Sequence, residues 1–204
     1  NGVAHYFKIH KIYGKVRFLN RLDRDTSGLV VVAKHGLAQH FYQMQMDDNR
    51  LEKWYRATVQ GRLEQAHEVL ELPIRKSADG IHQEVHPEGV MTKTEYEVLH
   101  YDAAQDTTDL RIRLWTGKTH QIRVTMAHIG HPLVYDPLYA DEGVLESRQS
   151  AWGIDEAQCH KGLQQEVTNT AKGQIEDIGK TFALRAYRLV CYHMRTGEQI
   201  VVEI

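Results

Sequence analysis

The sequence has little cysteine, little proline and no long apolar run. Only Cys159 and Cys191 occur among its 204 residues, they form no CxxC pair, and there are four prolines. Two separated cysteines do not form a disulfide framework, and they favour a reduced, cytoplasmic protein. No apolar stretch is long enough to span a membrane, and no signal-peptide pattern or glycine-rich phosphate loop is present. We therefore expect neither a disulfide nor a membrane partner.

An excess of charge of either sign is also lacking. Twenty-five Lys and Arg stand against 27 Asp and Glu, which gives a net charge of −2 and a pI near 6.7. This balance argues against a protein coated in positive charge, but it permits a local basic groove. Apolar residues make up 42% of the chain, which is enough for a packed core, and the length suits one domain over residues 1–204.

Hydrophobic periodicity predicts several elements. The short β-branched run 29–33 favours a buried strand, and the spacing of Leu37, Phe41 and Met44 predicts a helix over 36–48 with that stripe in the core. Residues 53–61 alternate as a strand, with Tyr55 and its alternate neighbours on one face. Further elements are expected as follows: an antiparallel hairpin of 94–101 with 108–115, a helix over 119–129 with Thr119 as N-cap and Gly130 at its C-terminal end, and strands near 183–191 and 199–204.

Two polar stretches interrupt this pattern. Residues 62–92 contain proline and glycine and predict a long exposed excursion with a short strand at 70–74. Residues 141–180 are polar and acidic, with five glycines, and predict a surface insertion. Long excursions from compact domains are often functional.

The chain is organised around the octapeptide 21–28, Arg-Leu-Asp-Arg-Asp-Thr-Ser-Gly. Two carboxylates lie between two arginines, directly before the apolar run. A carboxylate at the mouth of a buried loop needs a cation or hydrogen bonds to remain ionised. Taken alone, the octapeptide favours a structural turn with Asp–Arg pairs at the surface.

Two other constellations carry less weight. His120, His128 and His131 with Asp136 suggest a divalent metal site, but His120 and His128 are about 12 Å apart along a helix, too far for one ion. Ser27 suggests a hydrolase, but the strand-to-helix elbow G-x-S-x-G is missing, because Ser27 precedes a strand. We therefore predict no metal.

Three motifs resemble the RluA-type (RluA/RluD) RNA pseudouridine synthases. Residues 20–28 read NRLDRDTSG against the family's H-R-L-D-x-x-T-S-G, and residues 117–125 read GKTHQIRVT against G-R-x-H-Q-I/L-R-V-H. Residues 53–61, KWYRATVQG, are similar to the family strand K-x-Y-x-A-x-V-x-G. The likeness runs from about residue 16 to 139 and returns near 184–198. Asn20, Lys118 and Thr125 depart from the usual residues.

The resemblance implies an α+β fold with a mixed, largely antiparallel sheet, flanking helices and a central RNA-binding cleft. It also implies that the N-terminal part of the family domain is missing here. The roles it implies are as follows: Asp23 as the catalytic aspartate, Tyr55 in contact with the target base, Arg123 paired with the catalytic carboxylate, Ile122 lining the uracil pocket, and Arg21 beside the aspartate. For the flanking RNA we expect contacts from Arg24, Lys118 and His120.

The implied activity is the isomerisation of uridine to pseudouridine in ribosomal or transfer RNA. The reaction transfers no electrons and no group to another molecule, so we expect no cofactor. RNA is the expected partner, and no obligatory protein partner is evident. The two rival hypotheses are an RNA-binding module without catalysis and a metal-dependent hydrolase that uses the histidines.

Overall fold

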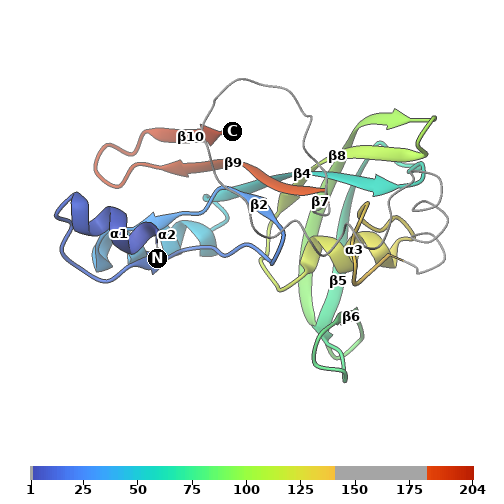
Figure 1. Ribbon diagram of the computed structural model, residues 1–204, viewed down its shortest axis with the longest axis horizontal. Helices are drawn as coiled ribbons and strands as arrows, with labels where there is room; N and C mark the ends of the chain where they lie inside the picture. Colours follow the sequence, from blue (N-terminus) through green and yellow to red (C-terminus); the bar gives the residue numbers. More distant parts are fainter. Residues whose placement is uncertain (1, 141–182) are drawn as a thin grey trace, which may run out of the picture.

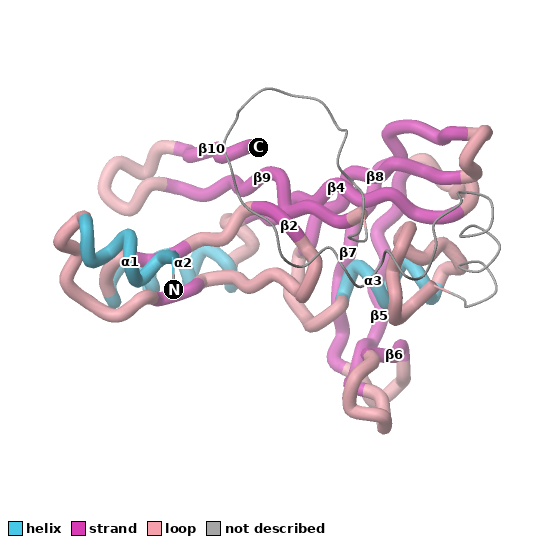
Figure 2. Tube along the Cα trace, in the orientation of Figure 1, coloured by secondary structure: helices cyan, strands magenta, loops and turns pink. Residues whose placement is uncertain are grey.

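The computed structural model describes residues 2–140 and 183–204, arranged as in Figure 1. The helices among them are α1 (Gly2–Ile9), α2 (Gly36–Asp47) and α3 (Gln121–His128). The strands are β1 (Arg17–Phe18), β2 (Ser27–Gly28), β3 (Val32–Ala33), β4 (Glu52–Gln60), β5 (His67–Lys76), β6 (Gln83–Val85), β7 (Val90–Asp102), β8 (Thr107–Leu114), β9 (Leu184–Tyr192) and β10 (Gln199–Glu203). Strand clearly outweighs helix (Figure 2), which confirms the α+β class. The insertion predicted at 141–180 lies outside the described residues.

One eight-stranded sheet runs through the molecule. Its order is β10-β9-β4-β8-β7-β5-β6, and neighbours along this path are antiparallel. β2 joins β9 in parallel, so the sheet is mixed but largely antiparallel, as predicted. The expected hairpin is confirmed as β7 and β8, and the two expected terminal strands as β9 and β10. β1 and β3 form a separate small sheet.

The main core lies between α3 and one face of the sheet. On β4, Tyr55, Ala57 and Val59 are all buried, so the face predicted from the alternation is confirmed. From α3, Ile122 and Met126 pack into the same cluster. Burial of aliphatic and aromatic side chains stabilises such a core by about 25 cal/mol per Å² of apolar surface. This packing fixes α3, and with it the second family-like motif, against β4.

The two ends of α3 are set by backbone conformation. Gly130 follows the C-cap residue with φ of +85°, the left-handed conformation that favours glycine there, so this prediction is confirmed. The N-cap prediction is wrong, because His120 and not Thr119 occupies that position. His120 has φ of +54° and makes no side-chain capping bond, since its ring is engaged elsewhere.

The prediction of a buried strand over 29–33 is wrong. Only β3 forms there, and Val30 is exposed. The backbone changes partner within this stretch. Leu29 donates its N–H to the carbonyl of Ala186 on β9, whereas Val31 accepts at its carbonyl from the N–H of Leu19. Because the hydrogen-bonding partner switches within three residues, no continuous strand develops.

Helix α2 forms where it was predicted but turns a different face inward. Leu37 is 67% exposed and Met44 is 50% exposed, so the prediction that this stripe is core is wrong. Gln45 is buried instead. Its side-chain amide donates to the carbonyl of Tyr192 and accepts the N–H of the same residue, both at 2.8 Å. This pair of bonds holds α2 against the end of β9 and sets its rotation.

Residues 62–92 are part of the sheet, so their prediction as an excursion from it is wrong. β5 is longer than the expected strand at 70–74. It pairs with β7 from His67, opposite Glu97, to Ile74, opposite Val90. β6 folds back on the end of β5. In Figure 1 this end of the sheet projects past α3. We call residues 73–91 the arm.

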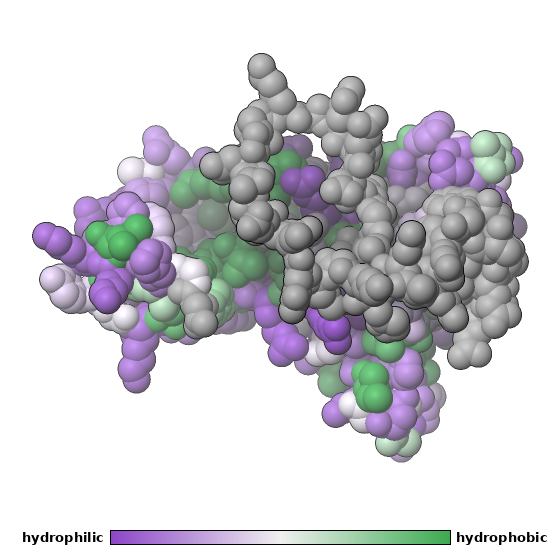
Figure 3. Space-filling model, viewed as in Figure 1, coloured by the Kyte–Doolittle hydropathy of each residue, from purple (hydrophilic) through white to green (hydrophobic). Residues whose placement is uncertain are grey.

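Outside the grey atoms, Figure 3 shows hydrophilic surface interrupted by hydrophobic areas at the end that carries α1 and α2, near the centre of the view and on the arm. Exposed apolar residues of these regions include Ile9 and Leu37 near the helices and Ile81 and Met91 on the arm. Single exposed apolar side chains are common on protein surfaces. None of the described helices is long and apolar enough to cross a membrane.

Candidate active site

A turn after β1 presents Asp23. The N–H of Thr26 donates to the carbonyl of Asp23 at 3.1 Å, and Asp25 inside this turn has φ of +68°, which aspartate tolerates better than most residues. Arg24 points to solvent with its side chain 91% exposed, and it pairs with Asp25 at 3.7 Å. The second carboxylate of the octapeptide therefore shapes the turn, whereas Asp23 is partly buried.

The base of this loop is held on both sides. Asn20 accepts the N–H of Val31 at 2.7 Å and donates its side-chain amide to the carbonyl of Leu29 at 3.2 Å. Gly28 lies against β9 with φ of +120°, and a Cβ atom there would be 2.1 Å from the carbonyl oxygen of Ala186. Only glycine permits this close approach. Asn20, where the family has histidine, thus serves to close the loop.

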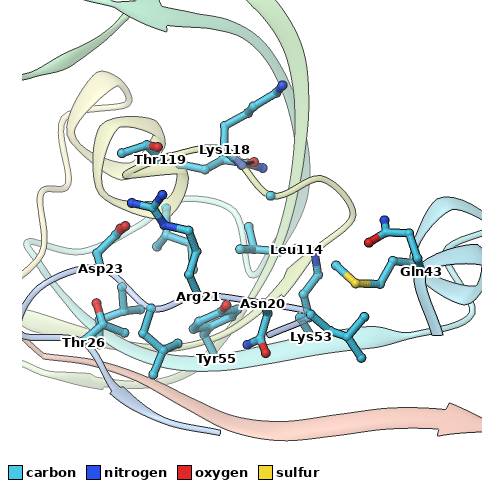
Figure 4. Close-up of a pocket in the computed structure, with 17 residues that line it drawn as sticks. Asn20, Arg21, Asp23, Thr26, Gln43, Lys53, Tyr55, Leu114, Lys118 and Thr119 are labelled. Atoms are coloured by element: carbon cyan, nitrogen blue, oxygen red, sulfur yellow. Dashed lines mark hydrogen bonds between the residues drawn. The ribbon is translucent and has the colours of Figure 1, made fainter. Parts of the chain in front are cut away.

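A cavity of about 450 Å³ opens beside the loop. Figure 4 shows Asp23 and Thr26 at one end, Gln43 and Lys53 at the other, and Tyr55 between them. The residues that line it are Leu19, Asn20, Arg21, Leu22, Asp23, Thr26, Gln43, Met46, Lys53, Tyr55, Leu114, Gly117, Lys118, Thr119, Gln121, Ile122 and Leu184. Three cations stand against one carboxylate in this lining. The cavity thus has a positive balance although the whole chain is slightly negative.

Tyr55 forms the floor of the cavity between two strands. It faces Ile112 on β8 and Ala186 on β9, and the register with β9 shifts between Trp54 and Tyr55. Such irregularities re-aim side chains and are frequent beside active sites. Burial and, secondarily, the negative charge of Asp23 raise the pKa of Tyr55 to about 12. The hydroxyl therefore remains protonated at neutral pH and lies within the field of the carboxylate.

Arg123 lies in α3 and is almost fully buried. Its Nε donates to Asp136 Oδ2 at 2.7 Å and its Nη2 to Asp136 Oδ1 at 2.5 Å, in a two-pronged ion pair with 3% and 0% of the two side chains exposed. Asp136 also accepts the backbone N–H groups of Leu138 and Tyr139. Sequence reasoning had weighed Asp136 only as a metal ligand. The expected pairing of Arg123 with Asp23 stays a prediction.

Tyr139 links α3 to the arm. Its hydroxyl accepts the N–H of Gln83 at 2.8 Å and lies 2.8 Å from His120 Nδ1. Its ring packs edge-on to His82 and His120, and the Arg123 guanidinium lies 5.1 Å from the ring centre. Burial and the Arg123 charge lower the pKa of His120, although Asp23 and Asp136 oppose this. His120 is therefore mainly neutral at pH 7, and its ring is hydrogen-bonded to the Tyr139 hydroxyl.

Gln121 fastens the second motif to the sheet. Its carbonyl oxygen accepts from the Thr116 hydroxyl and from the N–H of Lys118, both at 3.0 Å. Its amide nitrogen donates to the carbonyl of Lys93 and to the Thr94 hydroxyl on β7. Four bonds from one buried side chain keep the turn before α3 rigid, with Lys118 exposed at the cavity edge.

The structure brings most of the predicted site residues together. The cavity collects Asp23, Tyr55, Ile122, Arg21 and Lys118. Arg123 and His120 do not line it; they contact Asp136 and Tyr139, while Arg24 faces solvent. Sequence reasoning missed the roles of Lys53, Gln43, Leu114 and Leu184 as wall residues. Alternation along β4 places residue 53 on the Tyr55 face, a signal that was present, whereas Gln43 and Leu184 come from distant elements.

The two alternative sites do not assemble among the described residues. No three His, Cys, Asp or Glu side chains in that part of the chain are grouped to hold a metal ion. His131 uses its Nδ1 to donate to the carbonyl of Gln60 at 2.8 Å, whereas His120 contacts Tyr139. Ser27 is exposed in β2 and pairs with Arg185 of β9, so it has no nucleophile elbow.

Comparison with known proteins connects this site to a family. The model of the family described as "RNA pseudouridylate synthase" matches residues 10–128, which include the aspartate loop, β4 and α3. The chain belongs to the RNA pseudouridylate synthase family. The match confirms the resemblance seen in the three motifs, and it covers every predicted site residue.

Two curated relatives illustrate the relationship. The chain is 36% identical over 151 residues to "Uncharacterized RNA pseudouridine synthase YhcT" of Bacillus subtilis, covering 74% of this chain and 50% of that one. It is 38% identical over 139 residues to "Ribosomal large subunit pseudouridine synthase D" of Escherichia coli K12, covering 68% of this chain and 42% of that one. The chain thus spans about half the length of the curated relatives it matches.

A solved structure shares the fold. "Human RNA Pseudouridylate Synthase Domain Containing 1" aligns with a TM-score of 0.69 at 21% identity, covering 99% of this chain and 73% of that one. A second human family member, Domain Containing 4, aligns equally well at 18% identity. At these identities the likeness concerns the fold alone. It agrees with the mixed, largely antiparallel sheet described above.

Proposed function

We propose that residues 1–204 form a catalytic domain that isomerises uridine to pseudouridine in RNA, with Asp23 as the catalytic residue. The observation that carries the proposal is the position of Asp23. It lies beside Tyr55 in a cavity walled by Ile122, Leu114 and Leu184, in a chain of the RNA pseudouridylate synthase family.

The chemistry asks for one ionised carboxylate. In the reaction the bond from sugar C1′ to uracil N1 breaks, the base turns, and C1′ bonds to C5; the proton on C5 leaves and N1 gains one. Product and substrate are isomers, so the net reaction consumes no reductant and no group donor. Asp23 acts on the sugar, either by attack or by taking a proton.

The detached base must stay in place while it turns. Tyr55 and Ile122 are buried at 6% and 3% exposure and give the base an apolar, aromatic seat. The neutral Tyr55 hydroxyl is a polar contact for the uracil edge. The target must leave its stack to enter this seat, and such flipping costs a few kcal/mol, least in single-stranded or loop RNA.

For substrate we propose ribosomal or transfer RNA in the cytoplasm. The name of the Escherichia coli relative refers to the large ribosomal subunit, which makes ribosomal RNA the first to test. Arg21 and Lys118 at the cavity and Arg24 on the outer side of the loop supply the cations that hold the flanking backbone. His120, which is neutral, supports the RNA-binding side indirectly through Tyr139.

The first test compares Asp23→Asn with the parent. Each protein is incubated with unmodified ribosomal and transfer RNA transcripts without added metal, and pseudouridine is counted by nucleoside mass spectrometry. We expect product from the parent and a loss of at least about a thousandfold in the variant, because the amide keeps the shape but not the charge. Asp25→Asn is the matched control: it makes the same change two residues away, and asparagine tolerates the positive φ of that position.

Three outcomes are informative. Equal turnover of Asp23→Asn and the parent would remove the catalytic assignment. Loss of turnover in Asp25→Asn with normal Asp23→Asn would move it to the second carboxylate. RNA binding without product from the parent would leave the binding module as the better function.

A further inference from the structure

Lys53 is a buried charged group that the proposed reaction does not use. It lies on β4 between Leu114 of β8 and Leu189 of β9, with 9% of its surface exposed. Among the residues that the structure describes, its ammonium has no hydrogen-bond or ion-pair partner. A buried charge without a partner is costly and therefore rare in proteins.

The side chain is directed into the cavity. Figure 4 shows the Lys53 ammonium at the end near Gln43, on the opposite side from Asp23, with Tyr55 between. Burial lowers the pKa of Lys53, and no carboxylate counteracts this. Asp23 therefore does not serve as its counter-ion in the free protein.

A glycine lies close to the ammonium. A Cβ atom at Gly117 would be 3.3 Å from the Lys53 Nζ, so a larger residue there would crowd it. Gln43 and Met46 of α2 close this end of the cavity with an amide and a thioether, neither of which carries charge. Tyr55 and Ile122 line the same cavity.

We propose that Lys53 is a phosphate-binding residue, which holds the RNA backbone phosphate next to the target uridine. The assignment rests on the proposed function for the identity of the ligand. An anion is required because a neutral uracil carbonyl does not offset a buried ammonium, whereas a phosphodiester does. Lys53 and Tyr55 are two positions apart on one strand face, about 7 Å, so the subsite adjoins the base seat.

The consequence is a division of the cavity. The Asp23 end carries out chemistry on the sugar and base, and the Lys53 end fixes the backbone of the same strand. Docking of the phosphate returns to Lys53 the partner it lacks in the free protein. The cost of burying the ammonium is thus offset only when RNA is bound.

Lys53→Met tests this with two measurements on the full chain. In the absence of RNA, we expect the variant to have a Tm higher by about 2–4 °C, because methionine fills the space without a buried charge. Binding of an unmodified transfer RNA transcript should weaken by about tenfold or more, and the slope of log K against log salt should fall by about 0.7 in magnitude, as for one lost phosphate contact. Lys8→Met, on the exposed face of α1, is the matched control with the same change of charge.

A lower Tm of the free Lys53→Met protein would overturn the proposal, because Lys53 would then be a structural residue. Unchanged RNA affinity and salt slope relative to Lys8→Met would overturn it as well. Pseudouridine formation is counted in parallel. If the parent forms pseudouridine and Lys53→Met binds RNA as the parent does, the phosphate subsite is disproved but the proposed function is not. If the variant has a smaller salt slope but the parent forms no pseudouridine, the proposed function is disproved but the subsite is not.

Discussion

The role of the Tyr55 hydroxyl can be tested separately from that of its ring. The ring is part of the core, but the hydroxyl has no hydrogen-bond partner among the described residues and lies within the field of the Asp23 carboxylate. In Tyr55→Phe we expect turnover to fall about a hundredfold while KM changes little, since the polar contact to the reacting base is lost and the ring remains. Urea unfolding should change by less than about 1 kcal/mol. A normal rate would limit Tyr55 to packing.

The raised pKa of Tyr55 adds a signature at alkaline pH. The unfolded side chain titrates near 10.0 and the folded one at about 12, so the folded state binds more protons between these values. Stability from this residue is therefore complete below pH 10 and is lost as pH rises toward 12. The phenylalanine variant should lack this component, which urea unfolding at alkaline pH measures as the difference between the two proteins.

The buried ion pair of Arg123 with Asp136 is expected to contribute to the free energy of unfolding. Asp136→Asn removes the carboxylate charge that faces the buried Arg123 guanidinium, and we expect a loss of about 3–5 kcal/mol in the free energy of unfolding. Glu88→Gln breaks an exposed pair with Arg75 and should cost less than about 1 kcal/mol. Equal effects of the two variants in urea unfolding would mean that the Asp136 carboxylate contributes little.

The residues of the site differ in how well the sequence predicts them. The family motifs identify Asp23, Tyr55 and Ile122, because the residues around them match those motifs. Lys53 also matches its motif. Its lack of a partner could not be predicted, because its neighbours Leu114 and Leu189 come from other strands and lie beside it only in the folded sheet. The partner of Arg123 in the fold, Asp136, is likewise a tertiary fact.

Tyr139 connects the arm to α3, and its contact on the α3 side is the ring of His120. Because its folded pKa lies below the ordinary 6.5, the unfolded chain binds more protons as pH falls through that value, and stability falls with it. His120→Asn removes the titration while keeping a residue that accepts φ of +54°. We expect the variant to lose less unfolding free energy than the parent between about pH 7 and about pH 5.

The same variant should loosen the arm. Without the ring, Tyr139 loses its bond to α3, and amide exchange in residues 77–90 should be faster. His40→Asn, on the exposed surface of α2, is the control for a histidine without this contact. An identical pH dependence in the parent and His120→Asn would disprove the role of the His120–Tyr139 contact.

Elements were predicted well wherever local pattern decides them, and poorly where a distant partner does. β4 and β8 alternate cleanly because one face is buried along their length. The range of α2 was predictable, but its inward face was not, since Gln45 is selected by the backbone of Tyr192. The run 29–33 has the composition of a strand, but Leu29 is hydrogen-bonded to Ala186 whereas Val31 is hydrogen-bonded to Leu19.

The whole molecule depends on β9, which pairs with three other strands. β9 pairs with β4, β10 and β2, and its Leu184 lines the cavity. A chain that ends at residue 182 loses these contacts and exposes one edge of β4, so we expect no cooperative unfolding transition and no pseudouridine. A chain that ends at residue 198 loses only β10, whose residues are largely exposed, and should keep both. Circular dichroism melting and product counting measure the two outcomes.

The parallel contact of β2 with β9 joins two parts of the chain that are made at very different times. The ribosome produces the Asp23 loop early, but the strand that holds Gly28 in place is made after every other described strand except β10. Until β9 has left the ribosome, the aspartate has no wall at Leu184 and no fixed distance to Tyr55. If the proposed function is right, a growing chain becomes competent for catalysis only when synthesis has passed β9.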